Sequence, residues 1–195
     1  MSEAVRELPL FPLNTVLFPG GPLPLRIFEP RYLDMVSRCM REKSGFAVVL
    51  ITEGEETAAT ESFAATGTEA SIVDFDRLED GLLGISCIGR ERVRVLEAWR
   101  EADGLNRGRV VTIDADPVLP VPATQVWLSE VVRRVLPEAG DSYRHVAMRD
   151  DAAWVGNRLA EMLPLSLADK QALLELTDPL ERLSALEPAV SRTDS

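Results

Sequence analysis

Proline and glycine are distributed unevenly along the 195-residue chain, and this distribution limits what it can fold into. Six of the 13 prolines lie in the first 30 residues, and ten of the 12 glycines precede Val110. Proline interrupts helices and central strands, while glycine marks tight turns and bulges. The first part of the chain is therefore predicted to form short strands joined by turns, and the glycine-poor remainder to be helical.

The predicted strands alternate with clear turn signals. Residues 8–13 fit an extended edge strand that carries its prolines at non-bonding positions, and the Asp80-Gly81 pair supplies the positive φ angles of a hairpin turn. Residues 53–66 are small, acidic and threonine-rich, and are predicted to be an exposed excursion. The full set of predicted strands is 8–13, 23–27, 46–51, 68–75, 82–88, 92–99 and 109–113. Six or seven short strands with only one helix among them favour a small barrel over a βαβ array.

That single helix is predicted to begin at Pro30, where the missing N–H costs least, and to end at Gly45. Leu33, Val36 and Met40 recur at three- and four-residue steps, so they are predicted to form its apolar face, flanked by Tyr32 and Cys39.

A proline-rich linker at residues 116–122 precedes four further helical patterns. Ser166 and Asp178 are predicted to cap the last two helices. The predicted organisation is a β-barrel domain over residues 1–116, a helical bundle over 117–188 and a flexible tail over 189–195.

Charge and composition exclude several classes of protein. The 32 acidic and 21 basic residues give a formal net charge of −11, which disfavours binding to nucleic acid and to anionic membrane surfaces. No stretch approaches the roughly 18 uninterrupted apolar residues of a membrane span. Cys39 and Cys87 are both predicted to be small buried side chains, so a reducing cytoplasm is the expected location.

Catalytic motifs are matched only in part. Ser86 stands in a near match to the nucleophile elbow G-x-S-x-G, but the second glycine comes one residue late and strand-like sequence follows. The only histidine, His145, would have to act as its base. Ser166 and Lys170 have the spacing of a Ser–Lys dyad, although a helix cap explains Ser166 better.

Metal and cofactor sites are not predicted either. One histidine and two distant cysteines do not make a zinc site, and the acidic stretch from Asp74 to Asp80 lacks the glycine of a calcium loop. Neither lysine follows a glycine, so no phosphate-binding loop is present.

The only basic stripe consists of Arg90, Arg92 and Arg94, which alternate along one strand. It is short, lies beside Glu91 and lacks interleaved aromatic residues. A solvated strand face is therefore favoured over an RNA-binding site.

Several segments, taken in order, resemble one family. Leu8-Pro-Leu-Phe-Pro-Leu13, Phe18-Pro-Gly20 and Ile27-Phe-Glu-Pro-Arg-Tyr32 resemble the start of the LON substrate-binding domain, which is found at the N-terminus of Lon proteases and in cereblon-type proteins. Asn157-Arg-Leu159 and Leu163-Pro-Leu165 resemble its C-terminal helices. The resemblance covers about Glu7 to Leu186.

The resemblance implies an α+β fold: a PUA-like β pseudobarrel of about six strands with one inserted helix, followed by a C-terminal helical bundle. It also implies a free-standing, non-catalytic domain that binds protein or peptide segments, including unfolded ones, with a separate ATPase or protease as collaborator. No cofactor or metal is implied, and the oligomeric state and bound partner stay open. The alternatives are a PUA-like RNA-binding protein and an unrecognised hydrolase.

Phe28, Arg31 and Tyr32 are the predicted binding residues. They connect the second strand to the first helix, combine apolar area with a fixed cation, and are expected to border a groove near the junction of barrel and helices. The alternative is that they only lock the helix onto the barrel.

Overall fold

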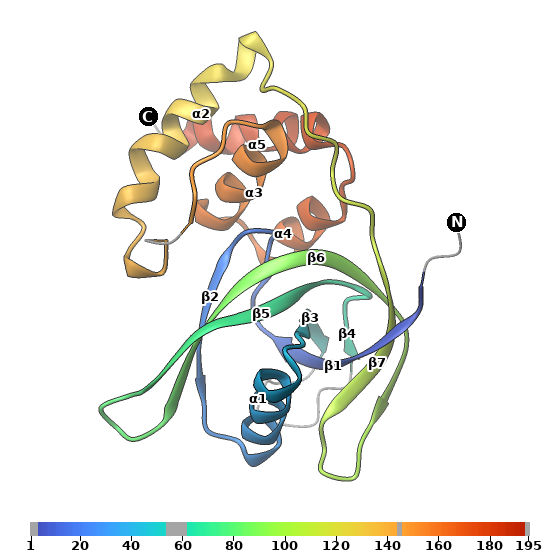
Figure 1. Ribbon diagram of the computed structural model, residues 1–195. Helices are drawn as coiled ribbons and strands as arrows, with labels where there is room; N and C mark the ends of the chain where they lie inside the picture. The colour runs from blue at the N-terminus through green and yellow to red at the C-terminus, as the bar shows by residue number, and fades with distance from the viewer. Residues whose placement is uncertain (1–3, 54–61, 144–145, 194–195) are drawn as a thin grey trace.

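The computed structural model describes residues 4–53, 62–143 and 146–193. The described residues form a mixed fold with a seven-stranded sheet and five α-helices. Figure 1 shows helices α2 to α5 gathered over one end of the curved sheet, while α1 lies at the other end. The mixed helix-and-strand class predicted from the sequence is confirmed.

The sheet closes on itself through its first strand. The strand order is β1-β7-β6-β5-β3-β4, and β1 also pairs with β3 in parallel, so β1, β7, β6, β5 and β3 make a closed circuit, here called the strand ring. Strand β2 lies outside this circuit and pairs with β6. The strands are β1 (Arg6–Leu13), β2 (Pro22–Ile27), β3 (Phe46–Glu53), β4 (Ser62–Phe63), β5 (Thr66–Arg77), β6 (Leu83–Arg100) and β7 (Asn106–Thr112).

The strand predicted at residues 8–13 is confirmed, but its position at a sheet edge is wrong, because β1 pairs with two other strands. Its residues Arg6 to Leu10 pair with β7, and its residues Leu10 to Leu13 pair with β3. Each half is therefore bonded along one side only. Pro9 lies in the first half and Pro12 in the second, so the free side of each half can accommodate a residue that lacks an N–H.

The two strands predicted at 82–88 and 92–99 are one continuous strand, β6, which pairs with β2, β5 and β7. Gly89 lets this strand pass close to the turn at Phe18, since a Cβ at Gly89 would lie 2.3 Å from the Phe18 carbonyl oxygen. The Gly89 N–H donates to the Gly21 carbonyl, and the Gly20 N–H donates to the Gly89 carbonyl, each over 2.8 Å. The predicted hairpin turn before β6 is confirmed, with Gly81 at a φ of 84°. Of the predicted exposed excursion, residues 54–61 lie outside the described residues, while Ser62–Phe63 and Thr66 belong to strands.

Helix α1 (Pro30–Glu42) begins at the predicted proline and ends three residues before the predicted Gly45. The residue after it, Lys43, adopts the left-handed conformation. Its predicted apolar face is partly wrong, because Leu33 and Met40 are 37% and 38% exposed. The buried face is rotated by one position and also follows helical spacing; it consists of Tyr32, Met35, Val36 and Cys39.

The remaining helices are α2 (Val126–Val135), α3 (Ala152–Met162), α4 (Leu167–Glu175) and α5 (Pro179–Thr193), with 3₁₀ turns at Ala123–Gln125, Leu136–Glu138 and Asp141–Tyr143. Both predicted caps are confirmed. The Ser166 hydroxyl accepts from the Asp169 N–H over 3.1 Å, and the Asp178 carboxylate accepts from the Leu180 N–H over 2.8 Å.

The prediction of a flexible tail from Ala189 is wrong through Thr193, where α5 ends. Leu183, Leu186 and Val190 are all buried and belong to one hydrophobic core. Their spacing of three and four residues continues the apolar face of the helix into the segment predicted to be a tail.

The helical core also contains residues from the first part of the chain. Phe18, which is fully buried, and Leu50 of β3 pack in the same cluster as Leu128, Leu159 and other helical residues. A division into domains at residue 116 stays a prediction; the shared core packs the two predicted parts against each other.

A buried charged cluster joins the strand ring to the helices. The Asp116 carboxylate, in the connection after β7, accepts hydrogen bonds from Arg92 of β6 and from Arg182 of α5, the latter over 2.6 Å. Arg92 also donates to the Leu174 and Leu176 carbonyls over 2.9 and 2.6 Å. Arg92 and Arg182 are only 4% and 1% exposed, so the expectation of a solvated stripe is wrong for Arg92. The arginine is buried because helices that follow far along the chain cover its strand.

Replacing Asp116 by asparagine should leave two buried guanidinium groups without their shared counter-charge. We expect Asp116→Asn to lower the free energy of unfolding by about 3–5 kcal/mol, measured by urea denaturation. Asp114→Asn changes a nearby exposed side chain and should cost about 0.5 kcal/mol or less. Equal effects of the two substitutions would contradict the central role of Asp116.

Candidate functional site

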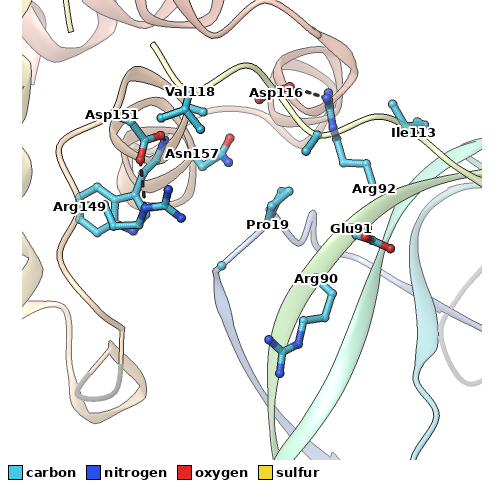
Figure 2. A pocket seen from close by; sticks show the side chains of 14 residues that line it. Pro19, Arg90, Glu91, Arg92, Ile113, Asp116, Val118, Arg149, Asp151 and Asn157 are labelled. Carbon is cyan, nitrogen blue, oxygen red and sulfur yellow. Dashed lines mark hydrogen bonds and ion pairs between the residues drawn. The ribbon is translucent and has the colours of Figure 1, made fainter. Parts of the chain in front are cut away.

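A cleft of about 270 Å³ opens where the strand ring meets the helices. It is lined by the Pro19-Gly20 turn, by β6 around Arg90, by the connection from Ile113 to Val118, and by α3 with the residues before it. Figure 2 shows Pro19 between the β6 side chains and the α3 side chains. The cleft therefore uses segments that are far apart in the sequence.

The Pro19-Gly20 turn is held in place by a buried ion pair. Arg158 of α3, which is fully buried, donates to the Gly20 carbonyl over 2.6 Å and to the Pro19 carbonyl over 2.9 Å. The same guanidinium contacts the Glu161 carboxylate at 2.7 Å, and the Tyr143 hydroxyl donates to that carboxylate over 3.1 Å. Because each group has fixed partners, this side of the cleft is preformed.

The opposite wall rests on the Arg92–Asp116 contact described above, which Figure 2 marks with a dashed line. Burial lowers the pKa of the Arg92 guanidinium, and the neighbouring Asp116 carboxylate opposes that effect. Beside this pair, the cleft offers apolar surface from Ile113 and from Val118, whose side chain is 74% exposed. Trp154 of α3 also lines the cleft but is nearly buried.

Most charges that line the cleft are paired. Arg149 contacts Asp151 at 3.0 Å, and the Glu91 carboxylate lies 3.7 Å from Arg6. Arg90 is different, because its exposed side chain makes no ion pair or hydrogen bond within the described part of the chain.

One polar side chain of the cleft lacks a partner although it is buried. Asn157 of α3 is only 5% exposed, and its Oδ1 accepts no hydrogen bond. In the sequence, Asn157 and Arg158 stand out only as part of the resemblance to the family. An asparagine within a helical pattern gives no sign of burial, so its place in a cleft was missed.

The predicted binding residues lie elsewhere. The connection between β2 and α1, which carries Phe28, is at the end of the strand ring away from α2 to α5 (Figure 1). Phe28 is 55% exposed and borders a separate groove of about 270 Å³ between β2 and α1. This groove lies where β2 meets α1, and the assignment of Phe28, Arg31 and Tyr32 as binding residues stays a prediction.

Arg31 and Tyr32 are occupied by structural contacts. The Tyr32 ring stacks on Phe11 with centroids 3.9 Å apart and is 5% exposed. Arg31 donates to the Gly104 carbonyl over 3.1 Å, contacts Glu29 at 2.7 Å and lies 4.8 Å from the Tyr32 ring centroid. These two side chains fix α1 to the strand ring, which leaves Phe28 as the member of the group that faces solvent.

The partial catalytic motifs do not assemble. Ser86 lies within β6, opposite Pro24 of β2 and Asp74 of β5, so no strand-to-helix turn exists at this serine. His145 lies outside the described residues. The Ser166 hydroxyl donates to Asp169 over 2.6 Å, whereas the Lys170 amine donates to the Glu161 carbonyl over 2.8 Å, so these two do not form a dyad.

Within the described ranges, no group of three or more histidine, cysteine or acidic side chains is placed to hold a metal ion. None of the helices in these ranges is both long and apolar enough to cross a membrane.

Comparison with known proteins assigns a family to this architecture. Residues 7–191 match the model of the ATP-dependent protease La (LON) substrate-binding domain. The crystal structure of a Lon N-terminal domain protein from Xanthomonas campestris is 40% identical, with a TM-score of 0.78 over 94% of this chain and 98% of that one. The N-terminal domain of a Mycobacterium avium complex Lon protease, at 18% identity and a TM-score of 0.67 over 95% and 98% of the two chains, shares the fold. The chain belongs to the LON substrate-binding domain family.

Full-length relatives extend well beyond the matched region. Lon protease 1 of Sorangium cellulosum is 32% identical over 199 residues, which cover 93% of this chain but 24% of that protein. Cereblon of Danio rerio is 32% identical over 124 residues, covering 62% of this chain and 28% of that protein. The chain thus spans about a quarter of the length of these relatives.

The buried Glu161 that secures the cleft should make stability depend on pH. Burial raises the pKa of Glu161 to about 7, and the Arg158 guanidinium opposes this rise. The folded state therefore holds a proton that the unfolded state releases near pH 4.5, so stability falls as pH increases from about 4.5 to 7. Wild type should lose unfolding free energy between pH 5 and pH 8, and we expect Glu161→Gln to reduce this loss by up to about 3 kcal/mol. Urea denaturation at the two pH values measures it.

Glu130→Gln, an exposed change on α2, serves as the matched control and should keep the wild-type profile. Parallel profiles for wild type and Glu161→Gln would contradict the assignment.

Proposed function

We propose that this chain is a non-catalytic recognition domain that binds protein or peptide segments, including unfolded ones. The observation that carries the proposal is the match of residues 7–191 to a family defined by substrate binding. The preformed cleft between β6 and α3 supports it, because fixed concave surfaces with a few polar groups are typical of binding sites. The family also leads us to propose a separate ATPase or protease as the collaborator that acts on the bound segment.

Two finer features belong to the same proposal. A PUA-like pseudobarrel is supported by the closed circuit of strands through β1. A reducing cytoplasm is supported by Cys39 and Cys87, which are both free and buried.

Phe28 is proposed as a second contact surface of the domain, and Arg31 and Tyr32 as the residues that hold it in place. Its ring is more than half exposed beside the groove between β2 and α1. An exposed aromatic side chain on a rigid support loses little conformational freedom when it binds an apolar segment.

The alternatives have less support. RNA binding needs a basic surface, whereas the net charge is −11 and Arg92 is buried, which leaves Arg90 and Arg94 of the predicted stripe. Hydrolysis needs an activated nucleophile, whereas Ser86 lies in the middle of β6.

Binding of a permanently unfolded, alkylated model protein tests the proposal directly. We expect saturable binding by wild type in fluorescence polarisation, and an affinity about three- to tenfold weaker for Phe28→Ser, since an apolar contact is lost. The thermal midpoint should change little because Phe28 is exposed. Ser37→Ala, an exposed change on α1, is the control. Absence of binding by wild type at both low and moderate salt would overturn the proposed function.

A further inference from the structure

The cleft between β6 and α3, here called the junction cleft, combines two unusual features. Among the described residues, it has a buried amide oxygen without a partner and a cation without a counter-charge. Asn157 is only 5% exposed, and its Oδ1 accepts no hydrogen bond from the described residues. Buried polar atoms almost always have a hydrogen-bond partner, so an exception beside a cleft indicates a group that a ligand completes. Arg92 donates to two carbonyls near this cleft. The Nε of Arg158 is also buried without a partner, but the other two nitrogens of that guanidinium donate to the Gly20 and Pro19 carbonyls.

The chemistry of the Asn157 side chain defines what it can recognise. A carboxamide has one acceptor oxygen and an NH₂ donor, which makes it the hydrogen-bonding complement of a peptide group. Its terminal torsion is soft, so rotation presents either edge to the ligand. The main chain of an extended peptide matches this requirement without demanding a particular side chain.

The charges and apolar surface add specificity. Arg149, Arg92 and Glu91 each have an oppositely charged neighbour, whereas Arg90 has none within the described part of the chain. Ligand binding at the cleft is therefore favoured by a carboxylate near Arg90. Figure 2 shows Arg90 on the β6 side of the cleft and Val118 and Asn157 on the side of α3, with Pro19 between them. Val118 and Ile113 provide apolar surface in the same cleft.

We infer that the junction cleft binds an extended peptide segment whose main chain pairs with Asn157, whose apolar side chain packs on Val118, and whose carboxylate pairs with Arg90. This inference rests on the proposed function and names the site and the ligand chemistry for it. The carboxylate comes either from an acidic side chain or from the C-terminus of the bound segment. Both sources present the same group to Arg90.

The test uses three leucine- and serine-rich decapeptides with an uncharged N-terminal dye. One ends in a free carboxylate, one ends in an amide, and one is amidated but contains an internal glutamate. Wild type should bind a carboxylate-bearing peptide about three- to fivefold more tightly than the neutral one, as expected for an exposed ion pair. A preference for the first peptide alone identifies the C-terminus, and a preference for the third identifies an acidic side chain.

Two substitutions separate the contributions. Arg90→Gln should abolish the preference for a carboxylate, while Arg41→Gln, an equal change of charge on α1, should preserve it. Asn157→Leu should weaken the binding of all three peptides about tenfold through lost hydrogen bonds. It should not lower the thermal midpoint, because the Oδ1 has no partner to lose in the free protein.

NMR of wild type gives a second measurement that does not depend on a variant folding. Among the five side-chain amides, only the Asn157 signals should shift strongly on titration; the other four belong to Asn14, Asn106, Gln125 and Gln171.

Three other binding results would each overturn a different part of the proposal. Peptide binding that is unaffected by Asn157→Leu and by Arg90→Gln would overturn the assignment to this cleft and leave the proposed function standing. Equal affinity of wild type for all three peptides would overturn the role of Arg90. Failure of wild type to bind these peptides and the unfolded model protein would overturn both proposals.

Discussion

Buried arginine side chains hold the C-terminal helices on the strand ring, and the rest of the structure depends on this attachment. Arg92 projects from β6 to Asp116 and to the carbonyls at the end of α4, while Arg182 of α5 contacts Asp116 from the other side. Arg158 of α3 binds the turn between β1 and β2 in the same way. A buried charge is tolerated only when its hydrogen bonds and counter-charge are supplied. Losing one of these contacts would therefore leave a buried charge without a partner and destabilise the fold.

Arginine suits this role for a geometric reason. The planar guanidinium carries five donors, which allows one side chain to bind two carbonyls and a carboxylate at once. The chain has 19 arginines but only two lysines, and its largest fully buried side chains are Arg158 and Arg182. Gln171 of α4 adds a neutral link, donating to the Thr66 carbonyl of β5 over 3.0 Å. The walls of the junction cleft are therefore built from polar anchors whose positions are fixed before any ligand arrives.

Local elements were largely predictable because their signals are local. The proline at the start of α1, the glycine of the β5–β6 hairpin and the caps at Ser166 and Asp178 each act within a few residues of their own position. The wrong predictions concerned which strands pair with each other and which surfaces the helices cover. Whether β1 is an edge strand depends on β3 and β7, and whether Arg92 is solvated depends on α4 and α5, which follow more than 70 residues later.

The sequence by itself determined where the helices and most strands begin, the resemblance to the family and the absence of the familiar nucleotide signatures. The tertiary structure alone decided that Arg92 is buried, that α5 continues past Ala189, and that Phe28 and the junction cleft lie at different ends of the strand ring. It also brought Asn157 and Arg90 to one cleft. The physical reason is that burial and charge pairing are properties of the assembled surface, and distant segments of the chain create that surface only when they pack.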